Sequence, residues 1–242
     1  KTLRVDGTDL MDKADPGLLE LELLEPSASR IEFQQTHLHD GTLLSELTLN
    51  PELAKITRRI TQAENARNFL MNCKLNILNI SKETKTYRFR TVVYRPLEIK
   101  STQDRQYLQG FVSIGGKMHP IPPSAEKRRL FSGSPEWITA QARSHTLIIR
   151  PLFQRGPSGM FHVEQSPTGQ TIGWLELPPV TLAPASEHEW DLRLYAGPMT
   201  VSDLADSGLE GAVSFGNFSC ITKFMLGILR WSYGWLHNYG LA

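Results

Sequence analysis

The sequence predicts an all-β protein, mainly an antiparallel β-sandwich, with helices at its C-terminal end. Apolar and polar residues alternate strictly through residues 69–79, which is the period of a half-buried strand. Short runs rich in β-branched and aromatic residues recur up to residue 198, separated by turns that carry Gly or Pro. After Pro198 the apolar period becomes helical.

The part before residue 69 has a mixed pattern. Residues 18–33 (LLELELLEPSASRIEF) predict a strand followed by a turn at Pro26. Asp40-Gly41 is a turn signal between two strand-like runs within residues 37–49. Residues 50–70 are compatible with two structures. They begin as a short helix, with Asn50 as the cap and Pro51 in the first position, or they form a strand through ITRRIT.

The middle of the chain is a series of predicted strands. After the strand at 69–79, SKETK is a polar turn and TYRFRTVVY (86–94) is the returning strand. Gly115-Gly116 marks a turn between two short apolar runs. Residues 135–153 (PEWITAQARSHTLIIRPLF) again have strand character. Three short strands follow, at residues 159–165, 170–177 and 190–198.

Two helices are predicted beyond Pro198. The first has Thr200 or Ser202 as a possible cap, with Asp203 and Asp206 in the early turns, where carboxylates suit the helix dipole. The second covers about residues 217–237. We therefore expect a sandwich domain over residues 1–198 and a helical part over residues 199–242.

Composition excludes several function classes. Hydrophobic residues make up 40% of the 242 residues and charged residues 21%, so the chain can form a large core. The net charge is +1, from 26 basic and 25 acidic residues, which argues against a nucleic-acid partner. Cys73 and Cys220 are the two thiols, and we expect two small buried hydrophobes rather than a bridge. The first ten residues do not resemble a signal peptide, and no apolar run is long enough to span a bilayer.

The histidines are the first candidates for a reaction or a metal. His37 and His39 are two residues apart, so a strand would place both on one face, a spacing that some zinc sites use. Further ligands would have to come from Asp40, His119 or His145, and nothing in the sequence brings these together. Histidines in exposed loops are the favoured interpretation, so no metal or other cofactor is expected.

Other short motifs also favour structural roles. Gly115-Gly116-Lys117 lacks the remaining residues of a phosphate-binding loop and is better interpreted as a hairpin turn. Residues 124–127 match S-x-x-K without its partner motifs. Residues 126–129 (EKRR) suggest a solvated turn, with an acidic partner surface as the minority interpretation. Core packing is preferred over a sugar platform for three tryptophans: Trp137, Trp174 and Trp190.

The closing helix is amphipathic. At 100° per residue, Lys223, Arg230, Gly234 and His237 form a narrow stripe opposite a broad apolar face. Such a helix either packs on a core or lies in a membrane interface, and its aromatic end favours the interface. Lys223 and Arg230 disfavour spanning. The residues predicted to contact the membrane are Phe218, Ile221, Lys223, Met225, Leu229, Arg230, Trp231 and Trp235.

The C-terminal motifs resemble the bacterial YidC branch of the YidC/Oxa1-type membrane protein insertases. In that branch a large periplasmic domain ends in a strand similar to LYAGP (194–198), followed by an aromatic-Gly-aromatic step. An amphipathic helix then leads to an N-[YW]-G motif, matched here by Asn238-Tyr239-Gly240. Residues 69–84 and 135–153 also resemble strands of that family. One departure is Phe224, which stands where the family usually has Pro.

The resemblance implies a galactose-mutarotase-like β-supersandwich on the periplasmic side of the bacterial inner membrane. It implies no catalytic residue and no cofactor. The expected function is that of an accessory domain that assists insertion and folding of inner-membrane proteins. Its expected partners are the Sec translocon with its accessory subunits, nascent membrane proteins and the membrane surface. The resemblance also implies that a transmembrane helix begins at Leu241-Ala242.

Two other functions stay open from the residues. The first is a carbohydrate-binding or aldose-epimerase-like sandwich, which would need a base and an acid converging in a cleft. His119, His145 and Glu136 are the candidates for such a pair. The second is a lipid-surface protein unrelated to insertion.

Overall fold

The structure is a computed structural model, and it describes most of the first 206 residues. The described residues are 4–5, 8–9, 18–25, 29–31, 34–37, 43–49, 53–62, 69–97, 108–123, 128–153, 160–166, 169–206, 209 and 212. In β1, β2, β4, β5 and β6 only the course of the strand is described.

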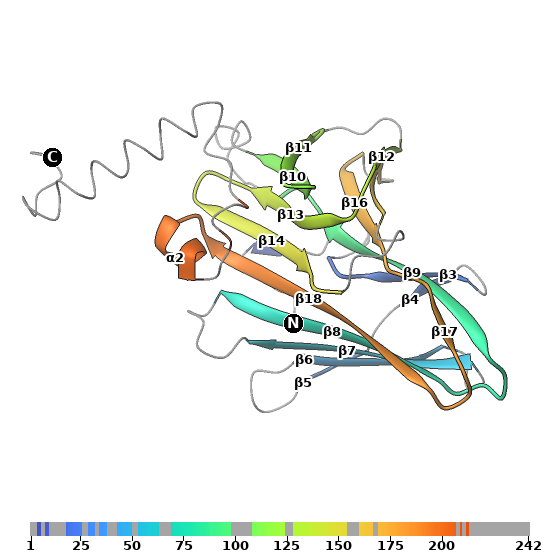
Figure 1. Cartoon of the computed structure of the whole chain (residues 1–242). Coiled ribbons are helices and arrows are strands. Elements are labelled where there is room, and N and C mark those ends of the chain that lie inside the picture. The colour runs from blue at the N-terminus through green and yellow to red at the C-terminus, as the bar shows by residue number, and fades with distance from the viewer. Residues whose placement is uncertain are drawn as a thin grey trace, which may run out of the picture.

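Two antiparallel sheets face each other and enclose the core (Figure 1). The larger sheet has nine strands, in the order β11 (Lys117–Ile121), β10 (Gln109–Ile114), β13 (Pro135–Gln141), β14 (His145–Pro151), β18 (Glu187–Pro198), β8 (Leu70–Asn79), β7 (Ala54–Gln62), β6 (Leu43–Leu49) and β5 (Gln34–His37). The smaller sheet has seven strands. Its order is β12 (Arg129–Phe131), β15 (Phe161–Gln165), β16 (Thr171–Glu176), β9 (Lys85–Tyr94), β3 (Leu21–Glu25) and β4 (Ser29–Ile31), with β17 (Val180–Leu182) also paired to β9.

Among the described residues, a two-stranded ribbon and one helix lie outside these two sheets. The ribbon pairs β1 (Arg4–Val5) with β2 (Thr8–Asp9). The helix is α2 (Val201–Asp206), which follows β18. The predicted all-β class with antiparallel pairing is confirmed. The predicted longer helix, residues 217–237, lies outside the described residues.

The alternating pattern in the sequence matches the two faces of each sheet. In β8, Cys73, Leu75 and Ile77 are buried against the smaller sheet, and Lys74 on the opposite face is exposed. Cys73 is a free thiol whose pKa burial raises to about 12, so it behaves as a small core side chain, as predicted. The core between the sheets also holds Trp190 on β18, which is 2% exposed.

The structure decides one alternative that the sequence left open and corrects one predicted strand. Of the two structures weighed for residues 50–70, the strand is observed, because β7 runs through Ala54–Gln62. The single run 135–153 is a hairpin, β13 and β14, which turns through residues 142–144 without Gly or Pro. The predicted hairpin at Gly115-Gly116 is confirmed: both residues have positive φ, 58° and 74°, between β10 and β11.

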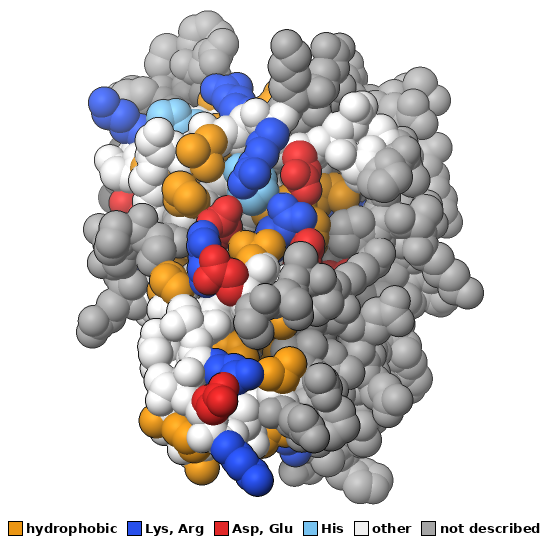
Figure 2. Space-filling model, turned by 90° about the vertical axis from the view of Figure 1, so that its right-hand side faces the viewer, with side chains coloured by type: hydrophobic (Ala, Val, Ile, Leu, Met, Phe, Trp, Pro, Cys, Tyr) orange, Lys and Arg blue, Asp and Glu red, His pale blue; other side chains and the backbone are white. Residues whose placement is uncertain are grey.

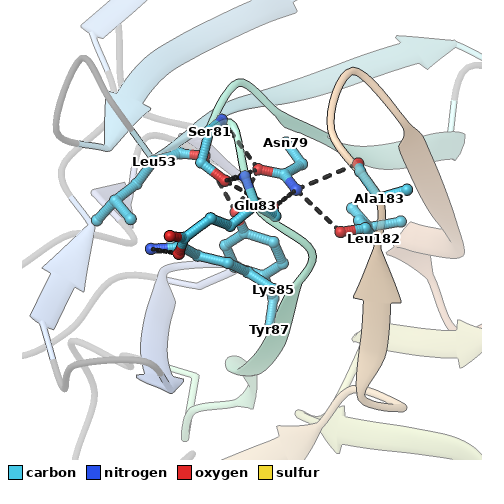
Figure 3. Close-up of polar contacts among 8 residues, drawn as sticks. All are labelled: Leu53, Asn79, Ser81, Glu83, Lys85, Tyr87, Leu182 and Ala183. Carbon is cyan, nitrogen blue, oxygen red and sulfur yellow. Dashed lines mark hydrogen bonds and ion pairs between the residues drawn. The ribbon is translucent and has the colours of Figure 1, made fainter.

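A buried asparagine joins two turns at one end of the sandwich (Figure 3). The Asn79 side-chain amide donates hydrogen bonds to three carbonyl oxygens, those of Glu83, Leu182 and Ala183, at 2.9, 2.9 and 3.2 Å. Its Oδ1 accepts from the backbone N–H and hydroxyl of Ser81 and from the Tyr87 hydroxyl. The turn after β8 is therefore tied to the turn between β17 and β18, more than 100 residues later.

The end of β18 explains the sequence LYAGP. Leu194 is in the core, while Tyr195 faces outward and donates its hydroxyl to the Pro198 carbonyl at 2.7 Å. Phe69 packs edge-on against Tyr195 and also lies over Gly197, where an added Cβ would be 2.6 Å from the Phe69 ring. Gly197 is thus required by the close approach of Phe69, and the ring pair shapes the outer surface of the larger sheet at this end.

Candidate functional site

Most of the site predicted from the sequence lies outside the described residues. This applies to all eight membrane-interface residues, from Phe218 to Trp235. None of the helices in the described ranges has the length and apolar character that crossing a membrane requires.

The residues proposed for an acid–base pair lie apart. Glu136, at the start of β13, accepts hydrogen bonds from Ser113 and from the backbone of Gly116. His145 lies near the other end of β13, because Gln141 pairs with Thr146. Five residues of strand separate these ends, about 17 Å. His119 on β11 packs edge-on against Phe131. The three side chains therefore do not form one cleft.

The other histidines, short motifs and tryptophans considered as functional candidates have structural roles where the structure describes them. No group of metal-ligating side chains occurs among the described residues, which include only the backbone of His37. Residues 124–127 are outside them. Trp190 is a core residue, as predicted, and Trp137 packs in a second cluster on the outer side of the larger sheet. Trp174 lies on the outer side of the smaller sheet and is 6% exposed.

The structure instead brings together a cluster of charged side chains, which we call the charged face, on the outer side of the smaller sheet. Figure 2 shows acidic and basic side chains gathered on this side of the molecule, with a histidine among them. Cross-strand pairing aligns Glu176 on β16, Arg90 on β9 and Glu22 on β3. The charged face comprises Glu22, Glu25, Arg88, Arg90, Arg128, His162, Glu164, Trp174 and Glu176.

Opposite charges alternate across the strands of the charged face. Arg90 bonds to Glu22 at 2.6 Å and reaches Glu164 at 3.6 Å. Glu176 lies between Arg128 and Arg88, at 3.5 and 3.7 Å. The result is a network in which each carboxylate has an arginine neighbour, and partly buried networks contribute more than isolated surface pairs.

His162 lies at the centre of this network with no exposed side-chain surface. Its Nε2 is 3.4 Å from Arg90 and its Nδ1 is 3.5 Å from Arg128. Burial and, to a smaller extent, the positive charges of Arg128 and Arg90 together lower the pKa of His162 to about 4. The imidazole is therefore neutral near pH 7, with one nitrogen available to accept from an arginine.

The charged face is poorly suited to carbohydrate chemistry. A sugar platform needs an open aromatic face, but the Arg90 guanidinium lies 4.1 Å above the Trp174 ring. His162 and Glu176 are 3.9 Å apart, yet no surface of His162 is open to a substrate. The geometry fits a stiff, internally neutralised surface.

A second surface feature lies on the outer side of the larger sheet, where the chain leaves β18. Thr200 caps α2 by accepting from the N–H of Asp203, which places α2 beside the ends of β14 and β18 (Figure 1). Leu204, Leu209 and Ala212 are buried on the sheet, and Gln141 donates to the Ala212 carbonyl at 3.2 Å. We call the described residues of this region, 199–206, 209 and 212, the docked segment. Its sheet-side contacts are Leu70, Trp137, Ile148 and Tyr195, with Phe69 at the rim.

Burial and a nearby carboxylate also affect the tyrosine under the docked segment. The pKa of Tyr195 is raised to about 12 by burial and by the charge of Asp203. Its hydroxyl therefore stays protonated and keeps donating to Pro198 throughout the physiological pH range. The docked segment is held to the sheet by apolar burial and by hydrogen bonds that do not titrate near neutrality.

Sequence comparison relates this chain to one family. Residues 154–228 match the model of the YidC periplasmic domain. The "Membrane protein insertase YidC" of Geotalea daltonii is 39% identical over 66 residues, which are 26% of this chain and 12% of that protein. The protein of the same name in Syntrophobacter fumaroxidans is 23% identical over 210 residues, 83% of this chain and 37% of that protein. The chain thus spans well under half the length of these relatives.

Structure comparison supports the fold. An α-galactosidase from Geobacillus stearothermophilus, AgaB of GH36, superposes with a TM-score of 0.51 at 9% identity, covering 84% of this chain and 32% of that chain. A galactose mutarotase related enzyme from Lactobacillus acidophilus has a TM-score of 0.48 at 9% identity, covering 69% of this chain and 71% of that chain. The likeness to the α-galactosidase, at 9% identity, concerns the β-sandwich and not the chemistry.

Proposed function

We propose, from the relationship of this chain to the YidC periplasmic domain, that it is a non-catalytic accessory domain of a membrane protein insertase. The match over residues 154–228 carries the proposal, because it includes the end of the sandwich and the docked segment together. The division expected from the sequence, a sandwich over residues 1–198 and a helical part over 199–242, belongs to this proposal. The domain acts on the periplasmic side of the bacterial inner membrane.

The docked segment gives this function a physical basis. A segment fixed to a sheet by buried side chains transmits the orientation of the sandwich to the residues that follow. The amphipathic residues 217–239 then lie in the membrane interface through the eight residues named above. The sandwich offers its outer faces to the Sec translocon, its accessory subunits and nascent membrane proteins.

A chimera tests the proposal. The chain replaces the matching region of the Syntrophobacter fumaroxidans insertase, which aligns over 210 residues, and the fusion is expressed in cells depleted of their own insertase. We expect growth and normal insertion of a reporter membrane protein. Leu204→Asp should reduce both, because a carboxylate cannot be buried at the 1% exposed position of Leu204 without large cost.

The matched control is Ala205→Asp, the same change at an exposed position of the same helix. It should leave insertion unchanged. Equal activity of the two variants would refute the coupling role of the docked segment. Equal activity of an insertase that lacks the chain would refute the accessory function.

A further inference from the structure

Four polar side chains form a row on the outer side of the larger sheet, next to the docked segment. Strand pairing places Arg150 of β14 opposite Arg193 of β18, Arg193 opposite Asn72 of β8, and Asn72 opposite Thr61 of β7. The neighbouring row, from Ile148 through Tyr195 to Leu70, lies under the docked segment. We call the four side chains the donor row.

The donor row contains an uncompensated pair of like charges. Within the part of the chain that the structure describes, neither Arg150 nor Arg193 forms an ion pair or hydrogen bond, and the buried Nε of Arg193 has no acceptor. Like charges directly opposite each other in a sheet are destabilising. Among the residues that the structure describes, no acidic side chain forms an ion pair with either arginine.

A second basic pair on the same face is neutralised by acidic side chains. Arg59 and Lys74 are also directly opposite each other. Lys74, however, bonds to Glu189 at 2.6 Å and lies 3.7 Å from Asp191. The hydrogen bond to Glu189 and the nearby acidic charges raise the pKa of Lys74. The pair at Arg150 and Arg193 thus differs in having no acid assigned to it.

The chemistry of the donor row fits an oxyanion. Arg150 and Arg193 are directly paired across two strands, and the forked N–H donors of a guanidinium group match phosphate oxygens in a bidentate manner. The Asn72 amide and the Thr61 hydroxyl can add further donors along the row. Arg150 is exposed, so the ligand would bind on an open surface and not in a cavity.

The surroundings favour a phosphate carried by a lipid. Leu152, two residues after Arg150, is 41% exposed, which provides an apolar side chain beside the charge. The docked segment, which leads toward the amphipathic C-terminal residues, lies on the same face of the sheet. We propose that Arg150 and Arg193 bind the headgroup phosphates of anionic phospholipids, so that the sandwich contacts the membrane directly. This goes beyond the accessory role and beyond the membrane contact of residues 217–239.

Vesicle binding of the 242-residue chain tests the proposal. The variant Arg150→Gln with Arg193→Gln is compared with wild type by flotation on phosphatidylcholine vesicles, with and without phosphatidylglycerol. Each basic residue at an anionic surface accounts for about a fivefold change in partitioning, so we expect a loss of up to about thirtyfold on the anionic vesicles. Both proteins contain residues 217–239, so the ratio of their vesicle binding depends on the two arginines alone.

The matched control is Lys117→Gln with Arg129→Gln, which removes the same charge from exposed positions on the edge strands β11 and β12. It should bind within about twofold of wild type. The thermal midpoint should not fall in the arginine variant, because neither arginine forms an ion pair or hydrogen bond with a residue that the structure describes.

Three outcomes would overturn the proposal. The first is equal binding of the arginine variant and its control. The second is binding of inorganic phosphate to the pair, seen as arginine-dependent NMR shifts, with no effect on vesicles. The third is unchanged vesicle binding together with loss of crosslinks to translocon subunits, which would assign the pair to acidic protein groups. The insertion assay with the chimera is independent of all three.

Discussion

Asn79→Ala should be among the most destabilising single changes in the described part of the sandwich. Asn79 has no exposed surface. Its amide N–H group donates to three carbonyls, and its side-chain oxygen accepts from Ser81 and Tyr87. Its Oδ1 faces only donors and its nitrogen only acceptors, so the orientation of the amide is defined by its partners. Tyr87 keeps its bond to the Leu53 carbonyl, but the Leu182 carbonyl and the Ser81 amide lose a buried partner.

The expected magnitude follows from these orphaned groups. A buried donor or acceptor without a partner costs about 1–3 kcal/mol, so two of them cost about 2–6 kcal/mol. In a chain of this size that corresponds to a fall of about 10 °C in the thermal midpoint. The assay is guanidinium unfolding with thermal scans as a second measure.

The control is Asn76→Ala on the same strand, whose exposed amide has one bond, to Glu187 at 3.2 Å. It should cost less than about 0.5 kcal/mol. Tyr87→Phe removes one bond to Asn79, so the double variant with Asn79→Ala should cost less than the sum of the two singles. A loss for Asn79→Ala within 1 kcal/mol of that for Asn76→Ala would refute the reasoning.

Three further predictions concern other parts of the sandwich. The pKa of His162 is about 4 in the folded state and about 6.5 in the unfolded chain, so the unfolded chain binds an extra proton as the pH falls. Between pH 7 and pH 5 the free energy of unfolding of wild type, measured in guanidinium, should therefore fall by about 2 kcal/mol more than that of His162→Gln. An equal loss in both proteins would contradict this. Gly197→Ala should destabilise the fold by about 1–3 kcal/mol, because the added methyl group displaces Phe69. The same change should be less destabilising in a Phe69→Ala background. An unchanged thermal midpoint for Gly197→Ala would contradict this. The chain should not accelerate the mutarotation of freshly dissolved galactose in polarimetry, because Glu136 and His145 lie at opposite ends of β13 and His162 has no exposed surface. Any rate above that of the buffer would refute this.

The sequence predicted strands well where a single face is buried. In β8 every inward position is apolar except at its end, so the period of two is plain. In β7 the inward series is Ala54, Ile56, Arg58 and Ile60, and the buried Arg58 interrupts it. Arg58 is accommodated because it donates to the Leu19 carbonyl at 3.0 Å, a partner 39 residues away. A local pattern contains no trace of that partner, so helix and strand stayed equally open.

The charged face was not predicted, for a similar reason. Alternation places Arg90, His162 and Glu176 on outward positions, which the sequence does indicate. Their meeting depends on the strand order β15-β16-β9, with Arg90 and His162 72 residues apart in the chain. Outward polar residues on separate strands look alike until that order is known. The LYAGP motif was recognised by its resemblance to a family motif. The packing of Phe69 on Gly197, which accounts for the glycine, is seen only in the structure.

The place of β18 has a consequence for how the chain is made. Of the strands described, β18 is the last in sequence, yet it lies in the interior of the larger sheet, between β14 and β8. Until residue 198 has been synthesised, the sheet exists as two halves, β11-β10-β13-β14 and β8-β7-β6-β5, each with an open hydrogen-bonding edge. Open edges invite pairing with other chains, and distant pairings form slowly. Folding of the larger sheet therefore reaches completion only after β18 has been synthesised, so an incomplete chain is exposed to aggregation until that strand arrives.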